Sequence, residues 1–307
     1  MSPAVHLVEV GPRDGFQSVG PLIPTQTKIA ILRRLHAAGL RRVEATSFVS
    51  PSAVPQLADA ERVLAEAYAL PGLDPQVLVP TEKHAERALA AGARHVAFVL
   101  SVSQRHNQSN VRRSPAESTR EYERLIARMP TEGRIRLNIA TAFDCPYEGK
   151  IDPAMTLALL DQLVPIAPWA EIALCDTTGR VTPAAVSELF NRALERYSTV
   201  GTWAFHAHDT FGMGAANALS AYHAGIRVFD ASVAGLGGCP FAPGATGNVA
   251  TEDLVWMFEG MGVATGVDLR ALVEVGHEVA LLPGAQTGGR VREAVKRACT
   301  PPDSVEP

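Results

Sequence analysis

The chain has 307 residues, of which 47% are apolar and 20% charged, and its formal net charge is −4. This balance allows a large buried core and gives no basic excess, so we expect a small-molecule partner and no nucleic acid. Four scattered cysteines without a Cys-x-x-Cys pair argue against a disulfide framework. The sequence contains no run of about 18 apolar residues of the kind that spans a bilayer.

The N-terminal stretch "MSPAVHLVEV" has neither the basic segment nor the apolar run of a secretory signal. Together with the cysteine usage, this favours the reducing cytoplasm as the location, with no membrane partner.

Short apolar runs alternate with amphipathic stretches along most of the chain. Helical periodicity is clear, for example, over 25–38, 82–91, 153–167 and 182–196, and the last of these begins with Thr182 as cap and Pro183 in the first turn. Eight candidate strands precede such stretches, at 6–11, 41–48, 75–80, 95–101, 134–143, 171–177, 202–209 and 228–235.

Repeated βα units predict a parallel sheet of the α/β class. An open doubly wound sheet is the alternative, but eight repeats in about 260 residues favour a closed (β/α)8 TIM barrel. We expect a single catalytic domain over 1–307, with the barrel at about 5–262 and additional C-terminal helices at about 263–300. Such barrels carry their chemistry at the carboxyl ends of the strands.

The first strand ends in "VEVGPRDGFQ", where Gly-Pro breaks the strand and delivers Arg13 and Asp14 to the rim. A turn with a surface ion pair is the alternative interpretation. The second strand carries Glu44 within "VEATS", and a carboxylate in an apolar strand needs a cation or donor, for which Arg13 is a candidate. Asp176 in "LCDTTG" ends the sixth strand in the same manner.

The seventh strand reads "FHAHDTFG". Because side chains on a strand alternate with period two, His206 and His208 point the same way and can present nitrogens to one cation. Two hydrogen-bonded core histidines are the alternative.

After the eighth strand comes "GLGGCPFAPGATGN", whose glycine content is typical of a mobile lid and which carries Cys239. Asn248 then precedes a helical pattern, where it could serve as a cap or as a carbonyl ligand. The four candidate ligands suit Mg²⁺, Mn²⁺ or Zn²⁺, and they are Asp14, His206, His208 and Asn248.

These motifs resemble those of the 3-hydroxy-3-methylglutaryl-CoA lyase family, metal-dependent TIM-barrel lyases related to the Claisen-type synthases. The resemblance runs from "VEVGPRDGFQ" through "VEATSFVSP", "CPYEGKI", "CDTTG" and "HAHDTFG" to "SVAGLGGCPFAPGATGNVATEDL". The synthases usually have Asn in place of Asp209 and lack the cysteine loop, so the lyase branch is favoured.

The resemblance implies cleavage of a 3-hydroxyacyl-CoA to acetyl-CoA and a keto acid such as acetoacetate, as in leucine degradation, by a homodimer. It implies that the four candidate ligands hold the divalent cation. Arg13 would stabilise the enolate, Glu44 would orient Arg13, Asp14 or His206 would accept the hydroxyl proton, and Cys239 would return a proton. The same resemblance gives four substrate contacts, namely Gln17, Ser47, Asn110 and Asp176.

Three other functions compete with the lyase. A Claisen-type condensation would use the same site, a metallohydrolase would carry its His-x-His on the first strand, and a binding protein would not turn over substrate. Departures from the family pattern at Ser18, Val19, Ser52 and Ala53 predict a reshaped acyl pocket, and Arg112 and Arg113 are either CoA phosphate contacts or a solvated face.

Overall fold

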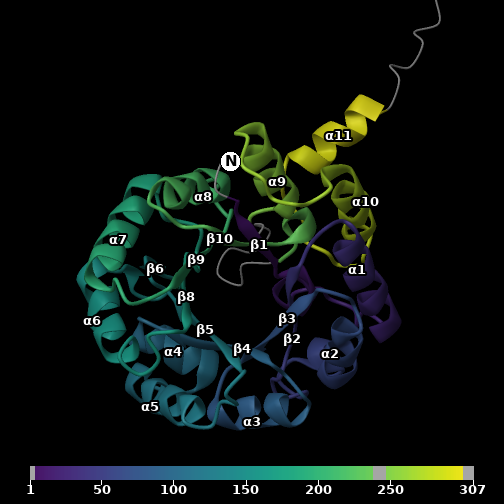
Figure 1. Cartoon of the computed structure of the whole chain (residues 1–307). Helices are drawn as coiled ribbons and strands as arrows, with labels where there is room; N and C mark the ends of the chain where they lie inside the picture. The colour runs from purple at the N-terminus through teal and green to yellow at the C-terminus, as the bar shows by residue number, and fades with distance from the viewer. Residues whose placement is uncertain (1–3, 238–246, 300–307) are drawn as a thin grey trace, which may run out of the picture.

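A computed structural model, which describes residues 4–237 and 247–299, contains a closed parallel barrel of eight strands (Figure 1). The strands close in the order β1-β10-β9-β8-β5-β4-β3-β2, which confirms the predicted TIM barrel. The barrel strands are β1 (His6–Glu9), β2 (Arg42–Ser47), β3 (Asp74–Val79), β4 (His95–Ser101), β5 (Arg134–Ala140), β8 (Glu171–Cys175), β9 (Thr202–His206) and β10 (Val228–Ala231). A small antiparallel hairpin, β6 (Asp144–Cys145) with β7 (Gly149–Lys150), lies in the connection after β5.

Helices surround the strands as an outer ring (Figure 1). The ring helices are α1 (Thr25–Ala37), α2 (Ala60–Tyr68), α3 (Glu82–Ala90), α5 (Pro115–Ile126), α6 (Pro153–Leu163), α7 (Pro183–Arg196), α8 (Gly214–His223) and α9 (Thr251–Gly260). A further short helix, α4 (Gln104–Val111), follows β4 directly. Short η segments lie at Gly11–Gly15 (η1), Pro55–Leu57 (η2) and Val233–Gly235 (η3).

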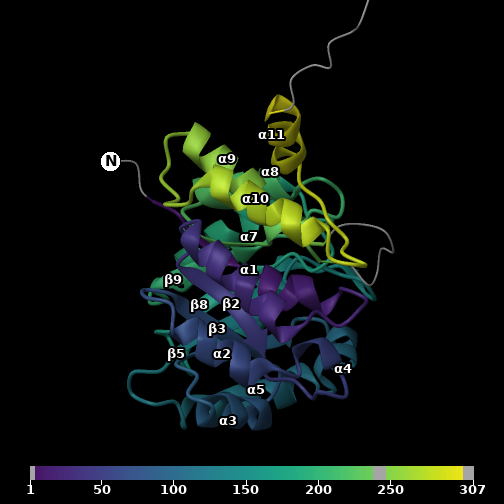
Figure 2. The same ribbon diagram turned by 90° about the vertical axis from the view of Figure 1, so that its right-hand side faces the viewer.

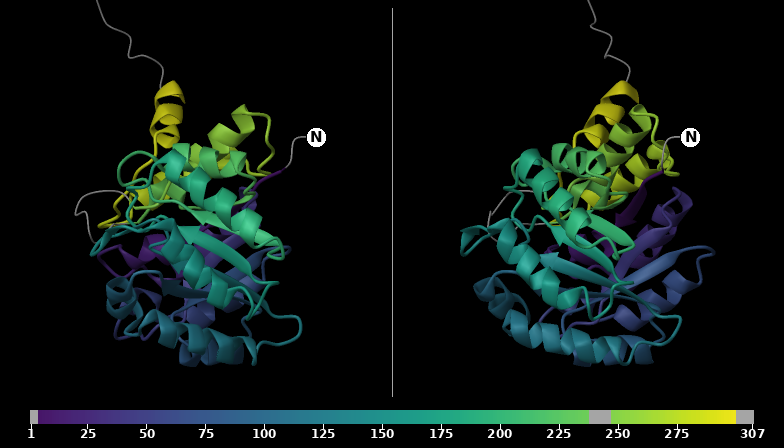
Figure 3. Two further views of the ribbon diagram at one scale, coloured as in Figure 1. Left: turned by 90° about the vertical axis from the view of Figure 1, so that its left-hand side faces the viewer. Right: turned by 60° about the vertical axis from the view of Figure 1, so that its left-hand side comes forward.

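Two helices, α10 (Leu269–Ala280) and α11 (Val291–Cys299), follow the ring helices in the segment where additional helices were predicted. The Asp268 backbone N–H at the start of α10 donates to Ala38 at the end of α1, at 2.8 Å. In the side views α9, α10 and α11 gather on one side of the barrel, and α11 projects away from it (Figures 2 and 3). No helix in the described ranges is long and apolar enough to cross a membrane.

The start of α7 follows the predicted signal. Thr182 is its cap residue and Pro183 its first residue, where the missing proline N–H costs nothing. The Thr182 side chain itself makes no capping hydrogen bond, so proline and the extended backbone of Thr182 define this end.

Strand alternation separates two packed regions. Phe205 and Phe229 face outward and pack on Phe190 of α7 and Phe258 of α9, with ring centroids 5.7 and 5.1 Å apart. Positions of the other parity face the barrel interior, where the apolar cluster is small, made of Val8, Val10, Ala173, Cys175, Ala204 and Val228. The short side chains leave interior space for long charged ones, and Arg136 is fully buried there.

Candidate active site

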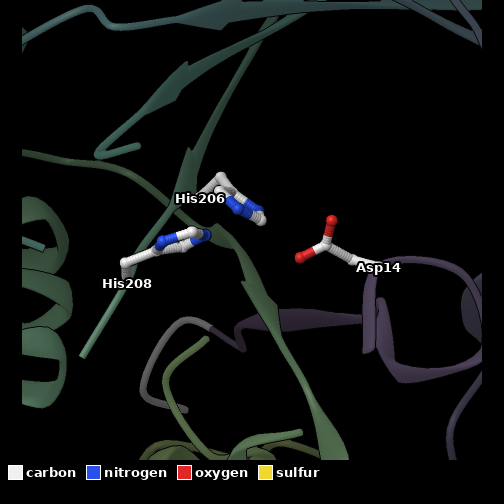
Figure 4. A group of neighbouring side chains, drawn as sticks. All are labelled: Asp14, His206 and His208. Atoms are coloured by element: carbon white, nitrogen blue, oxygen red, sulfur yellow. The ribbon is translucent and has the colours of Figure 1, made fainter. Parts of the chain in front are cut away.

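The two histidines of the "HAHD" motif lie together at the carboxyl end of β9. His206 is the last residue of that strand, and its ring centroid lies 5.1 Å from that of His208. Potential ligand atoms of Asp14, His206 and His208 all lie within 4.8 Å of one another. Figure 4 shows the Asp14 carboxylate facing both rings. The predicted shared face of the two histidines is therefore confirmed.

A single π-helical turn, η1, positions Arg13 and Asp14. The strand β1 ends at Glu9, and the Val10 carbonyl then accepts hydrogen bonds from the backbone N–H groups of Asp14 at 2.7 Å and Gly15 at 3.4 Å. Such wide turns are rare and are frequent at functional sites, because they redirect side chains within a few residues. Here the turn carries both charged side chains to the mouth of the barrel.

Arg13 is bound by two carboxylates. Its Nε donates to the buried Glu44, and its Nη1 donates to Asp14 Oδ1 at 2.5 Å. Burial disfavours the charged guanidinium, but the charges of Glu44 and Asp14 more than offset it and raise the pKa of Arg13. The partner predicted for Glu44 is thus the one observed.

Asn248 reaches the site through an antiparallel bridge. It pairs with His208, and the Val249 N–H donates to the Ala207 carbonyl at 3.1 Å. Its Nδ2 donates to Asp14 Oδ2 at 2.7 Å. Asn248 does not cap α9, because the cap residue is Ala250, so the bridge and not a capping role places this amide.

Two polar atoms of this cluster are buried without a hydrogen-bond partner among the described residues, namely Asn248 Oδ1 and His208 Nδ1. Buried polar atoms are normally paired, so an unpaired amide oxygen and imidazole nitrogen beside a carboxylate indicate a missing partner. Burial, reinforced by the neighbouring His206, lowers the pKa of His208 to about 4, so the ring is neutral as metal ligation requires. Carboxylate and amide oxygens with imidazole nitrogens fit a divalent cation.

The charges around Asp14 favour its ionised form. Burial alone would raise the pKa of this carboxyl, but the charges of Arg13 and His206 and the hydrogen bond from Asn248 lower it well below its usual range. Burial would likewise lower the pKa of His206, whereas the adjacent carboxylate of Asp230 raises it. The site therefore contains an ionised carboxylate next to an imidazole whose charged form is favoured by its carboxylate neighbours.

Asp176 lies beside His206 at the end of β8, where its backbone N–H donates to the His206 carbonyl at 2.9 Å. Its Oδ1 accepts from the Gly179 N–H at 2.9 Å, and its Oδ2 is buried without a partner in the described chain. Burial raises the pKa of Asp176 to about 6. A carboxyl group with this pKa can both donate and accept a proton near neutral pH.

The remaining predicted residues are placed less centrally. Ser47 is buried at the end of β2 and donates its hydroxyl to the Leu78 carbonyl at 3.0 Å. Gln17 follows η1 and Asn110 lies near the end of α4, and both are exposed. Cys239 lies outside the described residues.

Sequence reasoning missed Asp230, which contacts His206, and Arg136, which binds Asp230. Asp230 Oδ2 is 3.0 Å from His206 Nδ1, and Arg136 Nη2 donates to both Asp230 oxygens at 2.8 and 2.7 Å. The signal was available, because both are charged residues inside apolar strand patterns, as Glu44 is.

Two buried glutamates, Glu9 and Glu252, accept hydrogen bonds from residues on both sides of Asn248 in the sequence. Glu9 accepts hydrogen bonds from the Val233 N–H at 2.8 Å and the Thr251 hydroxyl at 2.7 Å, and Glu252 accepts from the Ala234 N–H at 2.9 Å. Burial raises the pKa of Glu9 to about 7 and that of Glu252 to about 8. All of these donors are uncharged, so Val233, Ala234 and Thr251 are bound to buried carboxyl groups without an ion pair.

Comparison with known proteins gives one consistent result. The HMGL-like family model matches residues 4–279. The mitochondrial hydroxymethylglutaryl-CoA lyase of Bos taurus is 42% identical over 291 residues, which are 94% of this chain and 89% of that protein. The cytoplasmic 3-hydroxy-3-methylglutaryl-CoA lyase of Danio rerio is 39% identical over 95% of this chain and 87% of its own length.

Solved structures agree. An HMG-CoA lyase from Acinetobacter baumannii, in complex with coenzyme A and 3-methylmalate, superposes with a TM-score of 0.90 at 37% identity, covering 97% of both chains. Hydroxymethylglutaryl-CoA lyase from Pseudomonas aeruginosa also gives a TM-score of 0.90, at 38% identity over 97% of this chain and 99% of its own.

Proposed function

We propose, from the premise that this chain belongs to the HMGL-like family, that it cleaves 3-hydroxy-3-methylglutaryl-CoA, or a close 3-hydroxyacyl-CoA analogue, to acetyl-CoA and acetoacetate or the corresponding keto acid. The observation that carries the proposal is the convergence of Asp14, His206 and His208, with ligand atoms within 4.8 Å of one another, next to Arg13. Curated relatives named as lyases favour cleavage over the Claisen-type condensation.

The carbon–carbon bond breaks when the tertiary hydroxyl loses its proton and the departing carbon becomes an enolate of the thioester. Both changes create negative charge, so catalysis requires cationic groups that are already in place. Arg13 supplies such a charge to the enolate oxygen. The Glu44 carboxylate fixes the Arg13 side chain, so the guanidinium need not reorganise during the reaction.

The hydroxyl proton needs an acceptor at the mouth of the barrel. Asp14 and His206 are the two candidates, since the first is ionised and the second sits beside it. Cys239 returns a proton to the enolate carbon to give acetyl-CoA.

Asp14, His206, His208 and Asn248 would hold a divalent cation such as Mg²⁺, Mn²⁺ or Zn²⁺, because the set offers two oxygen and two nitrogen donors. When bound, the cation would lower the pKa of the substrate hydroxyl and polarise the oxygen atoms of the substrate that it binds. Gln17, Ser47, Asn110 and Asp176 are proposed to contact the acyl-CoA.

The test is release of acetyl-CoA from 3-hydroxy-3-methylglutaryl-CoA by the purified protein with Mg²⁺ or Mn²⁺, and loss of that activity after chelation. Neighbouring branched 3-hydroxyacyl-CoA thioesters test the acyl group. No cleavage of any thioester, together with release of free CoA from acetyl-CoA and a keto acid, would establish the condensation instead.

Replacement of Cys239 tests the assigned proton donor. Cys239→Ala should lower kcat by about 10²–10⁴-fold, the range typical of a lost general acid, while bound metal per chain stays unchanged. An unchanged kcat would remove Cys239 from the mechanism.

The resemblance also supports a homodimer, a role in leucine degradation and a cytoplasmic location, and one of the similar lyases is named as cytoplasmic. Sedimentation of the purified chain tests the dimer, and fractionation of the native host cells tests the location.

A further inference from the structure

His206 and His208 are supported unequally, and the difference lies in their Nδ1 atoms. His206 Nδ1 is 3.0 Å from Asp230 Oδ2, whereas His208 Nδ1 has no partner among the described residues. Asp230 lies on β10 directly opposite His206 on β9, so the strand register itself brings the carboxylate under the ring.

Arg136 holds that carboxylate from across the barrel. It belongs to β5, which is separated from β10 by β8 and β9 in the closed sheet. Its Nη2 donates to both Asp230 oxygens at 2.8 and 2.7 Å. The side chain is fully buried, so this ion pair is shielded from solvent and salt.

The other guanidinium nitrogens of Arg136 are also engaged. Its Nε donates to Asn138 Oδ1 at 2.9 Å, and its Nη1 donates to Glu171 Oε1 at 3.1 Å. All three nitrogens therefore have partners, which leaves the guanidinium a single orientation.

A carboxylate bound by a guanidinium can only accept hydrogen bonds, so the His206 Nδ1 facing it must carry the proton. The lone pair of the neutral ring is then at Nε2. Carboxylates that fix the tautomer of a ligand histidine in this way affect metal affinity without touching the metal.

We propose that Asp230 and Arg136 are positioning residues for His206: Asp230 fixes its Nδ1–H tautomer and ring orientation, and Arg136 fixes Asp230. The inference rests on the proposed function only in treating His206 as a metal ligand. It leaves Asp14 as the acceptor of the hydroxyl proton, because a ring that carries a proton on Nδ1 and ligates through Nε2 has no free lone pair. Neither Asp230 nor Arg136 contacts the substrate in this scheme.

The main test is the affinity of the purified protein for Mn²⁺, followed by titration calorimetry. Asp230→Asn should weaken Mn²⁺ binding by about 10–100-fold, the range found when residues that support a ligand are replaced. Arg136→Lys keeps the charge but loses the planar set of donors, and it should weaken binding by less.

Asp74→Asn is the matched control. Asp74 also lies in the barrel and also faces a histidine, since its Oδ1 is 3.2 Å from His95 Nδ1, but it belongs to the opposite end. Its replacement should leave the Mn²⁺ affinity unchanged. An equal loss in Asp74→Asn and Asp230→Asn would overturn the proposal, because a general loss of stability would then explain both.

A second readout needs no metal and is made on the wild-type protein. In ¹⁵N-histidine-labelled, metal-free protein in mildly alkaline buffer, long-range ¹⁵N–¹H correlation should show His206 as the Nδ1–H tautomer, with the signal assigned by its loss in His206→Gln. An Nε2–H tautomer would overturn the proposal. If wild-type protein fails to bind Mn²⁺ but shows the Nδ1–H tautomer, the proposed metal site fails and the positioning of His206 stands.

Discussion

The two ends of the barrel interior contain the same kinds of charged and polar residues, but the hydrogen-bond partners of these residues differ between the ends. At the amino end, Glu171 accepts from Arg42 at 3.0 and 2.9 Å, and Asp74 accepts from Arg134 at 2.7 Å. At the carboxyl end, Asn248 Oδ1 and His208 Nδ1 have no partner in the described parts of the chain.

This difference separates a structural cluster from a candidate site. Buried charge alone is present at both ends, so it does not identify the site. Acceptor atoms without a partner are found where a cation and substrate would complete the set. At the amino end the carboxylates are already paired with Arg42 and Arg134, and even Arg42 Nε, which makes no hydrogen bond to the described residues, lies 3.5 Å from Asp74 Oδ2. Substitutions at the carboxyl end should therefore change activity, and those at the amino end should change stability.

The largest effect is expected for His208→Gln. We expect kcat/KM to fall by more than about 100-fold, beyond the loss typical of residues that only support a ligand. The melting temperature should change little, because the Nδ1 atom of this ring makes no hydrogen bond to the described residues. Steady-state kinetics and calorimetry on one preparation check both points, and a large drop in melting temperature would assign His208 to the structural class.

Gly237→Ala should come next. Gly237 has φ +137°, and an added Cβ would lie 2.7 Å from Asn248 Nδ2, so alanine strains the backbone and displaces the amide. The backbone strain alone costs about 1–3 kcal/mol. We expect weaker Mn²⁺ binding, measured by titration. Gly260→Ala is the control, because nothing lies within 4 Å of a Cβ added there.

Asp74→Asn should act on stability and not on turnover. Loss of its charged hydrogen bonds should reduce the free energy of unfolding by about 1.5–3 kcal/mol, with kcat at saturating metal unchanged. Burial alone would raise the pKa of Asp74, but His95, Arg134 and Arg42 lower it, so its contribution is present above the ordinary value of 3.8 and is lost as the pH falls through the lowered pKa. Denaturant unfolding of wild type and variant should therefore converge in acid. A constant difference at every pH would show that the charge of Asp74 is not what stabilises the amino end.

The smallest effect is expected for Glu252→Gln, and it concerns pH dependence. Burial raises the pKa of Glu252 from 4.5 to about 8, so the folded state binds more protons than the unfolded state between these values. Stability present below pH 4.5 is then lost as the pH rises towards 8. Between pH 4.5 and 8 the melting temperature should fall less steeply with rising pH for Glu252→Gln than for wild type. Glu259→Gln on the same helix should keep the wild-type dependence of melting temperature on pH in this window. Hydrogen bonds from Thr265 lower the pKa of Glu259 below 4.5, so this group does not titrate between pH 4.5 and 8.

Local periodicity determined much of what could be predicted. Apolar runs separated by amphipathic stretches specified the barrel, and period-two alternation put His206 and His208 on one face. Glu44 was recognisable as a residue that needed a cation. These inferences depend on neighbours within a few positions, which the sequence displays directly.

Contacts between distant segments were decided only by the tertiary structure. Arg136 and Asp230 are 94 positions apart and meet because the barrel closes, and Asn248 reaches Asp14 across 234 positions through the bridge to His208. The exposure of Asn110 depends equally on how α4 lies against the barrel. By itself the sequence determined which strands and side-chain faces exist, since alternation is a local property. Barrel closure and strand register determined which of those faces meet, because pairing across the fold depends on every strand at once.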